Sequence, residues 1–247
     1  MLTKDRAVCL RCVDYSETSQ VVTLFAEQAG KLAAIAKGSR RPKSAFDGPV
    51  EIFSFGSVVY QPARGGQLGT LTEFQQQPVF RGIRSSLYGL QCGLCAAELV
   101  EALTIPADPN PSLFESIVQF LTDLQSSAKP DDQLALLILF QLRLLQEIGL
   151  LPILHQCANC SNPYRGNWRT IHFAPDANGL VCPDCESAYP DKLVLSRPAA
   201  DALADLHRLQ ETSHTARREI EKFLLDHFTR LIHRPLKTAA AVLSRTT

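Results

Sequence analysis

The sequence of 247 residues has no excess of charge of either sign, because 25 basic side chains balance 25 acidic ones. Dedicated nucleic-acid binders are usually basic overall, so such a function would have to come from a local cluster of cations. The sequence also lacks a Gly-x-x-x-x-Gly-Lys phosphate loop, which leaves nucleotide hydrolysis unsupported. It contains no internal repeat and no low-complexity tract, so neither a solenoid nor a compositionally biased chain is expected.

Long apolar runs are missing as well. The longest, at residues 134–140, is far shorter than the ~20 residues that a membrane span requires. Asp5 and Arg6 interrupt the N-terminus before the apolar region of a secretory signal could form. We therefore expect a cytoplasmic protein that does not contact the membrane.

The apolar residues that are present suffice for a core, since 45% of the chain is hydrophobic and 20% is charged. The length allows two or three small domains. The first 76 residues are rich in Val, Ile, Phe and Thr between turn residues, which predicts five short strands. They lie at residues 7–13, 20–25, 32–36, 50–60 and 67–74, with a left-handed Gly30 in the turn at 27–31 and another turn at 64–66. Five such strands suit a small closed barrel, which leaves no sheet edge open.

Helical periodicity replaces this pattern after Pro78. Helices are predicted at residues 86–104, 112–125, 132–148, 197–209 and 215–232. Ser112 and Glu115 have the spacing of a capping box. The helix at 132–148 is apolar nearly all round, so we expect it to be deeply buried. Residues 153–190 show little periodicity and are rich in Cys, Pro, Asn and Gly. This segment therefore needs a cross-link, such as a bound metal ion, in order to fold.

Two cysteine pairs can supply that cross-link. Cys157 and Cys160 are followed, after 21 residues, by Cys182 and Cys185. Each Cys-x-x-Cys turn offers two thiolates, and the intervening hairpin brings the two halves together around a tetrahedral zinc ion. Four thiolates close the coordination sphere and leave no position for an activated water, so the predicted zinc ion is structural.

Other interpretations of this segment stay open on the sequence alone. The four cysteines could be reduced and unliganded, or one pair could be a redox dithiol. His155 and His172 are close enough in sequence to compete as ligands, although a surface or supporting position suits them better because four cysteines suffice.

The remaining cysteines form two weaker pairs. Cys9 and Cys12 lie three apart on a predicted strand, where alternation places them on opposite sides. Cys92 and Cys95 lie on one face of a predicted helix and are expected in the core, although the sequence does not decide whether they have a redox role.

The main cationic cluster lies in a predicted loop. No acidic residue occurs between Glu27 and Asp47, and Gly38 and Pro42 prevent the preceding strand from continuing. The cations of this loop are Lys37, Arg40, Arg41 and Lys43. At this density they neutralise phosphates without sequence preference, and on a small barrel they suit a single strand of nucleic acid. A solvated loop without a ligand is the alternative. Arg81 and Arg84 are expected to extend the patch at the domain junction.

Several of these residues resemble one known family. The stretch at residues 15–19 (Tyr-Ser-Glu-Thr-Ser), residues 21–25, Gly30-Lys31 and the Lys-Gly-Ser-Arg-Arg-Pro-Lys-Ser string at 37–44 are similar to the N-terminus of the RecO family of bacterial recombination mediators. Residues 140–145, then Gly149, Pro152, Leu154 and the first cysteine pair, are similar to the helix that leads into that family's zinc module. The likeness keeps its order through most of the chain.

The resemblance implies an oligonucleotide-binding (OB) barrel, a helical bundle and a zinc module inserted in the helical part. We accordingly predict an OB domain at residues 1–79, a helical domain at 80–152 and 191–247, and a zinc-binding module at 153–190. Carried over to this chain, the resemblance implies that DNA is bound by Lys37, Arg40, Arg41 and Lys43. It also implies that one zinc ion is bound by Cys157, Cys160, Cys182 and Cys185.

The resemblance also implies binding of single- and double-stranded DNA and annealing of complementary strands, in the cytoplasm and on the nucleoid. The implied protein partners are RecR, the single-strand-binding protein and, indirectly, RecA. The neutral overall charge implies that DNA binding is confined to one face.

Two other functions compete with a DNA-binding recombination mediator. One is a non-enzymatic protein-interaction scaffold for which DNA contact is incidental. The other is an enzyme, either a thiol oxidoreductase or a metal hydrolase. An enzyme would need an exposed thiol of low pKa or a zinc ion with an open position, and the spacing offers neither. We therefore expect a protein that acts by binding, without catalysis.

Overall fold

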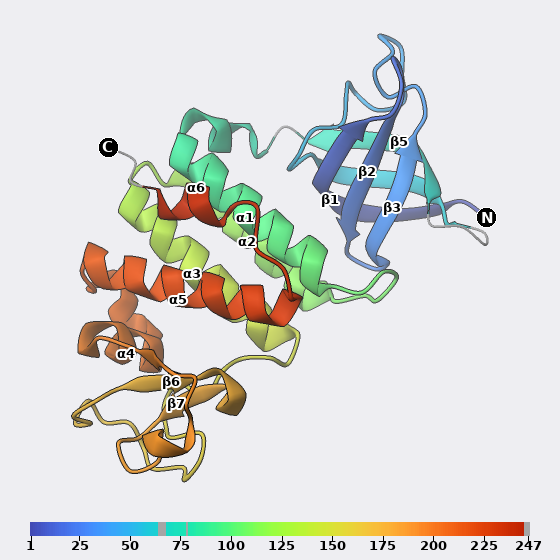
Figure 1. Ribbon diagram of the computed structural model, residues 1–247. Helices are drawn as coiled ribbons and strands as arrows, with labels where there is room; N and C mark the ends of the chain where they lie inside the picture. Colours follow the sequence, from blue (N-terminus) through green and yellow to red (C-terminus); the bar gives the residue numbers. More distant parts are fainter. Residues whose placement is uncertain (64–67, 78, 245–247) are drawn as a thin grey trace. The chain divides into compact units, whose positions relative to one another are not determined.

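The computed structural model describes residues 1–63, 68–77 and 79–244. The chain divides into two compact units, Met1–Ala128 and Lys129–Thr247. The first unit holds a barrel and two helices, and the second holds helices and a small sheet (Figure 1). No helix in the described part of the chain is long and apolar enough to cross a membrane.

The first unit begins with a closed barrel of strand order β1-β2-β3-β5-β4, which confirms the predicted five-stranded, OB-like barrel. The strands are β1 (Thr3–Asp14), β2 (Gln20–Ala26), β3 (Gly30–Ala36), β4 (Phe55–Gln61) and β5 (Gly69–Gln77). Neighbouring strands are antiparallel except for β3 and β5, which pair in parallel. Apolar side chains of alternate residues, such as Val22, Leu24 and Leu71, fill the interior.

Strand β1 carries a bulge. Cys9 pairs with Leu24 and Arg11 pairs with Thr23, so one residue of β1 has no counterpart on β2. The extra residue resets the alternation, and Cys12 therefore packs against the same core as Cys9. The prediction that these two cysteines face opposite sides was wrong, because strict alternation takes no account of a bulge.

The turn between β2 and β3 is as predicted, with Gly30 at a φ of 68°. A Cβ atom on Gly30 would lie 2.1 Å from the carbonyl oxygen of Asp108, so only glycine fits there. The predicted turn at 64–66 lies outside the described residues. The predicted strand at 50–60 is shorter in the structure, because Phe53 has a φ of 67° and leaves the extended conformation. Its ring packs on Gly93, where a Cβ would lie only 2.8 Å away.

Three helical segments complete the first unit: η1 (Arg81–Ser85), α1 (Leu87–Leu103) and α2 (Pro111–Ser126). Ser86 caps α1 by accepting a hydrogen bond from the amide of Gly89. The capping box predicted at Ser112 was wrong. Asn110 caps α2 instead, through the amide of Leu113, because Pro111 occupies the first helical position without losing a hydrogen bond.

The second unit is built on α3 (Pro130–Glu147) and α5 (His214–Ile232), which pack together. Both helices were predicted, and α3 buries much of its surface as expected. The other segments are α4 (Arg197–Ala204), η4 (Leu206–Gln210) and α6 (Ala239–Leu243). The predicted helix at 197–209 breaks at Asp205, whose carboxylate caps η4 by accepting from the amide of His207.

Between α3 and α4 lies a small sheet of order β7-β6-β8, formed by β6 (His172–Ala174), β7 (Gly179–Val181) and β8 (Leu193–Val194). Two short turns, η2 (Pro175–Ala177) and η3 (Glu186–Ala188), follow β6 and the second cysteine pair. The sheet and the flanking loops form the module that carries the four clustered cysteines, beside α4 (Figure 1).

Candidate functional site

The four cysteines of the module come together as the spacing predicts. The sulfur atoms of Cys157, Cys160, Cys182 and Cys185 all lie within 4.8 Å of one another, and none forms a disulfide. In a tetrahedral site with Zn–S bonds of about 2.3 Å, neighbouring sulfur atoms are about 3.8 Å apart. The sulfur atoms of Cys160 and Cys182 are 3.7 Å apart. The donor set therefore fits a structural metal ion.

Tight backbone turns shape each half of this cluster. The amide of Ser161 donates to the carbonyl oxygen of Cys157 (2.9 Å), and the amide of Cys185 donates to that of Cys182 (3.0 Å). The side-chain amide of Asn159 donates to the sulfur of Cys185 (3.3 Å). A donor to sulfur such as Asn159 stabilises the thiolate, which is the form of cysteine that binds metal.

The pKa values of the cysteines reflect the same surroundings. Burial raises the pKa of Cys157, but the amides of Cys160, Cys182 and Asn159 outweigh it and bring this pKa to about 7. Burial and the thiol of Cys185 raise the pKa of Cys182 to about 12. Four thiols packed together cannot all ionise unless a cation offsets their charge, which again fits a metal ion.

The two histidines near the cluster have other roles. His172 lies on β6, and its Nδ1 is 2.6 Å from the carboxylate of Glu186. His155 is exposed, and its carbonyl oxygen accepts from the amide of Tyr164 (3.0 Å). In the described part of the chain, the group of potential metal ligands consists of the four cysteines without either histidine.

The second predicted site, the basic loop at residues 37–44, leaves the end of β3. Its cations Lys37, Arg40, Arg41 and Lys43 are all exposed. Ser39 alone points inward and is fully buried, and its hydroxyl donates to Oε1 of Gln20 (3.0 Å). The same Oε1 accepts from the amide of Val50 (2.9 Å), and Nε2 of Gln20 donates to the Val50 carbonyl (3.0 Å). Gln20 thus ties the basic loop to residues 49–54.

The loop cations differ in their partners. Nη1 of Arg40 lies 2.9 Å from the carboxylate of Asp14, and these side chains are 39% and 58% exposed. Within residues 1–63, 68–77 and 79–244, no carboxylate lies within 4.0 Å of Lys37, Arg41 or Lys43. An exposed ion pair contributes only about 0–1 kcal/mol, so a phosphate can compete with Asp14 for Arg40.

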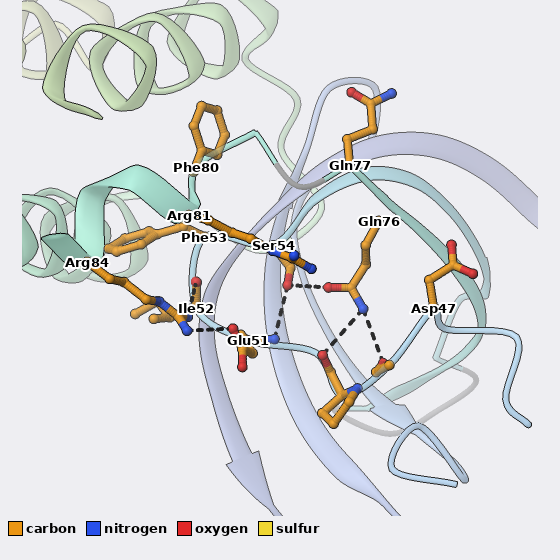
Figure 2. A pocket seen from close by; sticks show the side chains of 12 residues that line it. Asp47, Glu51, Ile52, Phe53, Ser54, Gln76, Gln77, Phe80, Arg81 and Arg84 are labelled. Atoms are coloured by element: carbon orange, nitrogen blue, oxygen red, sulfur yellow. Dashed lines mark hydrogen bonds and ion pairs between the residues drawn. The ribbon is translucent and has the colours of Figure 1, made fainter. Parts of the chain in front are cut away.

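Arg81 and Arg84 lie on η1 and border a hollow of about 520 Å³. Figure 2 shows both side chains extending from η1 toward the segment that carries Glu51 and Ser54. Arg84 forms an ion pair with Glu51 (2.6 Å) and donates to the carbonyl of Ile52 (3.4 Å). Lining residues from the barrel side include Asp47, Phe53, Gln76, Gln77 and Phe80.

A second hollow, of about 380 Å³, joins this region to the basic loop. Arg40 and Arg84 both line it, together with Cys12 and Asp14. The two hollows share the walls formed by Pro49, Glu51, Ile52 and Arg84, and we call them together the barrel groove. The structure therefore brings Arg40 of the basic loop to the same groove as Arg81 and Arg84, whereas Lys37, Arg41 and Lys43 do not line it.

Tyr15 is a candidate that the sequence analysis missed. It is 69% exposed on the turn between β1 and β2. This turn is bonded to the basic loop, since the carbonyl of Thr18 accepts from the amide of Arg40 (3.2 Å) and the hydroxyl of Ser19 accepts from the amide of Gly38 (3.3 Å). An aromatic residue in an otherwise polar turn was the available signal.

Cys12 is a second residue whose environment the sequence did not reveal. It lines the barrel groove, and a hydrogen bond from the thiol of Cys9 lowers its pKa to about 7, assisted by the amide of Ile52. The pKa of Cys9 is raised by the same bond and by complete burial. Cys92 and Cys95 are fully buried on α1, as expected of core residues.

This geometry defines a class of protein: an OB-like barrel with an exposed basic loop and a groove lined by arginines and carboxylates, joined to a unit whose four-cysteine cluster fits a metal ion. Family models agree with the class. Residues 1–77 match the model described as Recombination protein O N terminal, and residues 84–240 match the model described as Recombination protein O C terminal.

Individual relatives give the same result. The chain is 33% identical over 218 residues to DNA repair protein RecO of Bacillus subtilis (strain 168), which covers 86% of this chain and 82% of the relative. It is 34% identical over 204 residues to DNA repair protein RecO of Anaeromyxobacter sp. (strain K), with 83% and 77% covered. The chain belongs to the RecO family of DNA repair proteins, as its resemblance to that family predicted.

Proposed function

We propose that this chain acts in recombinational DNA repair by binding DNA along the barrel groove, with Lys37, Arg40, Arg41, Lys43, Arg81 and Arg84 as the phosphate contacts. The observation that carries the proposal is the position of the basic loop. Three of its cations have no carboxylate within 4.0 Å in the described part of the chain, and the fourth shares a groove with Arg84. Such cations replace the counterions condensed on a phosphate backbone.

A single strand suits this groove better than a duplex. Tyr15 presents an exposed ring on the turn that is bonded to the basic loop, and unpaired bases stack on such rings. Stacking and phosphate neutralisation both tolerate any base, so binding is independent of sequence. Duplex DNA offers the same phosphates but no free base, and it binds through the loop alone.

Annealing follows from weak, non-specific contacts. Two complementary strands repel each other until their phosphates are neutralised. The ion pairs of Arg40 and Arg84 are exposed, so these arginines exchange between protein carboxylates and DNA phosphates at little cost. The duplex can therefore be released once it has formed, and no covalent step is needed. The protein acts by binding and not as an enzyme.

One zinc ion bound by the four cysteines holds the module at 153–190. The support is the 4.8 Å cluster and the absence of a disulfide among the cysteines. Four thiolate ligands favour zinc, and they leave no open position for catalysis. The ion therefore contributes folding free energy to this module.

Membership of the RecO family supports RecR and the single-strand-binding protein as partners, and RecA as an indirect one. In this proposal RecA is loaded onto DNA that is coated with the single-strand-binding protein. This takes place in the cytoplasm, on the nucleoid. The two compact units divide the chain after Ala128. The finer domain boundaries at residues 79, 152 and 190 remain a prediction.

The test is a charge reversal in the basic loop. The double variant Arg40→Glu, Arg41→Glu should lose at least tenfold in affinity for a single-stranded oligonucleotide at low salt, measured by fluorescence anisotropy. Lys129→Glu, Lys222→Glu makes the same change in net charge at exposed positions of the second unit and should bind normally. Undiminished binding by the loop variant would mean that the loop assignment is wrong. Complexes with partner proteins in the absence of DNA affinity would favour a scaffold.

A further inference from the structure

The second unit has its own stretch without acidic residues. No Asp or Glu occurs between Glu147 and Asp176, a longer interval than the one that contains the basic loop. The interval holds Arg165 and Arg169, which lie in the loop between the first cysteine pair and β6. Neither arginine belongs to the metal cluster or to the barrel groove.

This loop is held in a fixed conformation by two aromatic side chains. Tyr164 and Trp168 are buried, and their rings meet edge to face at 5.2 Å. The hydroxyl of Tyr164 donates to the carboxylate of Asp201 on α4 (2.7 Å), and burial raises the pKa of Tyr164 so that this hydroxyl stays a donor. Since the aromatic residues point inward, the arginines that follow each of them are exposed.

Arg197, at the start of α4, joins the two loop arginines. Its Nη2 donates to the carbonyl of Trp168 (3.0 Å), which places its guanidinium beside Arg169 in the chain. No carboxylate in the described part of the chain lies within 4.0 Å of Arg165, Arg169 or Arg197. Asp201 is already engaged by Tyr164 and lies 3.6 Å from Arg208. In the described part of the chain, the three arginines, which we call the module patch, therefore form no ion pair.

The surroundings of the module patch favour a phosphate backbone over a protein partner. The exposed side chains of the loop are those of Ser161, Asn162, Pro163, Asn167 and Thr170 besides the two arginines. Ser161, Asn162 and Asn167 offer polar groups, whereas the hydroxyl of Thr170 already donates to the carboxylate of Glu186 (2.9 Å). None of these exposed side chains is a large apolar group, whereas protein interfaces depend on buried aromatic and aliphatic anchors. Guanidinium groups match the geometry of phosphate oxygens.

We propose that the module patch is a second phosphodiester-binding surface, which holds a second DNA strand while the barrel groove holds the first. The inference rests on the proposed function, because annealing requires two strands on one protein. Each compact unit would then supply one strand site, and the structural metal would serve DNA binding by fixing the loop that presents Arg165 and Arg169.

The test is a bridging experiment with two non-complementary oligonucleotides, one labelled with a fluorescence donor and one with an acceptor. The wild-type protein should bring them together and give energy transfer. The double variant Arg165→Glu, Arg169→Glu should bind a single oligonucleotide within twofold of wild type, yet lose at least tenfold in energy transfer and in the annealing rate of complementary strands. Lys129→Glu, Lys222→Glu is the matched control and should behave as wild type. Metal content and circular dichroism of the variant should be unchanged, because neither arginine is a ligand or a core residue.

Bridging and annealing at wild-type levels in Arg165→Glu, Arg169→Glu would overturn the inference, since the two strands would then be held by other surfaces. A competition experiment with the Arg40→Glu, Arg41→Glu variant gives a second way to overturn it. If poly-glutamate displaced a bound oligonucleotide as effectively as competitor DNA of equal charge, the module patch would be a site for an acidic protein. Failure of the proposed function appears elsewhere, as undiminished single-strand affinity in the basic-loop variant.

Discussion

At the scale of single residues, the position of Tyr15 makes a prediction that charge alone does not. Tyr15→Ala should weaken binding of a single strand by about five- to a hundredfold, the range expected for the loss of one stacked base. Tyr15→Phe keeps the ring and should bind like wild type. Duplex affinity and the dependence of binding on salt should be unchanged in both variants, because no phosphate contact is lost. Equal losses in Tyr15→Ala for single strand and duplex would exclude stacking.

Glu221 gives a second prediction at this scale. It is fully buried on α5, and desolvation raises its pKa to about 7, although its Oε1 accepts a hydrogen bond from Gln141 of α3 (2.9 Å). Within the described part of the chain, its Oε2 and the Oε1 of Gln141 have no hydrogen-bond partner, and a proton on Glu221 turns one of these acceptors into a donor.

The sign of the pH dependence follows from this raised pKa. The folded protein keeps a proton on Glu221 that the unfolded chain loses near pH 4.5, so the stability of the second unit falls as the pH rises from about 4.5 to 7. In Glu221→Gln this loss is absent. The stability of the variant relative to wild type should increase by about 2 kcal/mol between pH 5 and pH 7 and then level off.

Urea unfolding at several pH values measures this difference. His227, whose pKa burial lowers to about 4, destabilises the folded state toward acid, but it contributes equally to both proteins and cancels. A stability difference that does not change with pH would show that Glu221 is ionised in the folded state.

At the scale of elements, the metal-binding module should depend on its ion much more than the barrel does. Removing the metal with a chelator leaves four thiols that repel when ionised, and the three-stranded sheet is too small to hold the module alone. Hydrogen exchange should show loss of protection at residues 153–190 and unchanged protection in β1 to β5. Cys157→Ser should lose the metal, whereas Cys12→Ser should keep one ion per chain. If the metal-free protein melted like the metal-bound one, the ion would have no structural role.

The sequence predicts those helices and strands in which apolar residues recur with helical spacing over several turns or alternate with polar residues along a strand. The β1 and β2 strands and the α3 and α5 helices belong to this group, because each buries one face or more over at least seven residues. The three strands of the module have two or three residues each, too few for a period to appear. The break at Asp205 and the cap at Asn110 depend on single side chains that compete with the helix.

The candidate sites were predictable to different degrees for the same reason. The spacing of the four cysteines in the sequence is enough to predict that they form a metal site, and the structure brings them together. The barrel groove depends on side chains from three separate segments, around residues 12–20, 40–54 and 76–84, and only tertiary packing unites them. The bulge in β1, which turns Cys12 inward beside Cys9, has no signature in the sequence.

At the scale of the whole molecule, a net charge of zero is compatible with DNA binding because the charges are not mixed evenly. Long acid-free intervals contain the basic loop and two arginines of the module patch, Arg165 and Arg169. Acidic side chains are concentrated elsewhere, for example in ion pairs with Arg6 and Arg230. Overall neutrality keeps non-specific attraction to polyanions low at a distance, so that binding depends on the local contacts.

Neutralisation of DNA phosphates by the basic loop predicts how single-strand binding depends on salt. Each neutralised phosphate contributes about −0.7 to the slope of log K against log salt concentration. With six phosphate contacts the wild-type slope should be about −4. Arg40→Glu, Arg41→Glu should make it shallower by about 1.4, whereas Lys129→Glu, Lys222→Glu should leave it unchanged. A slope that is the same in wild type and in the loop variant would show that Arg40 and Arg41 do not neutralise DNA phosphates.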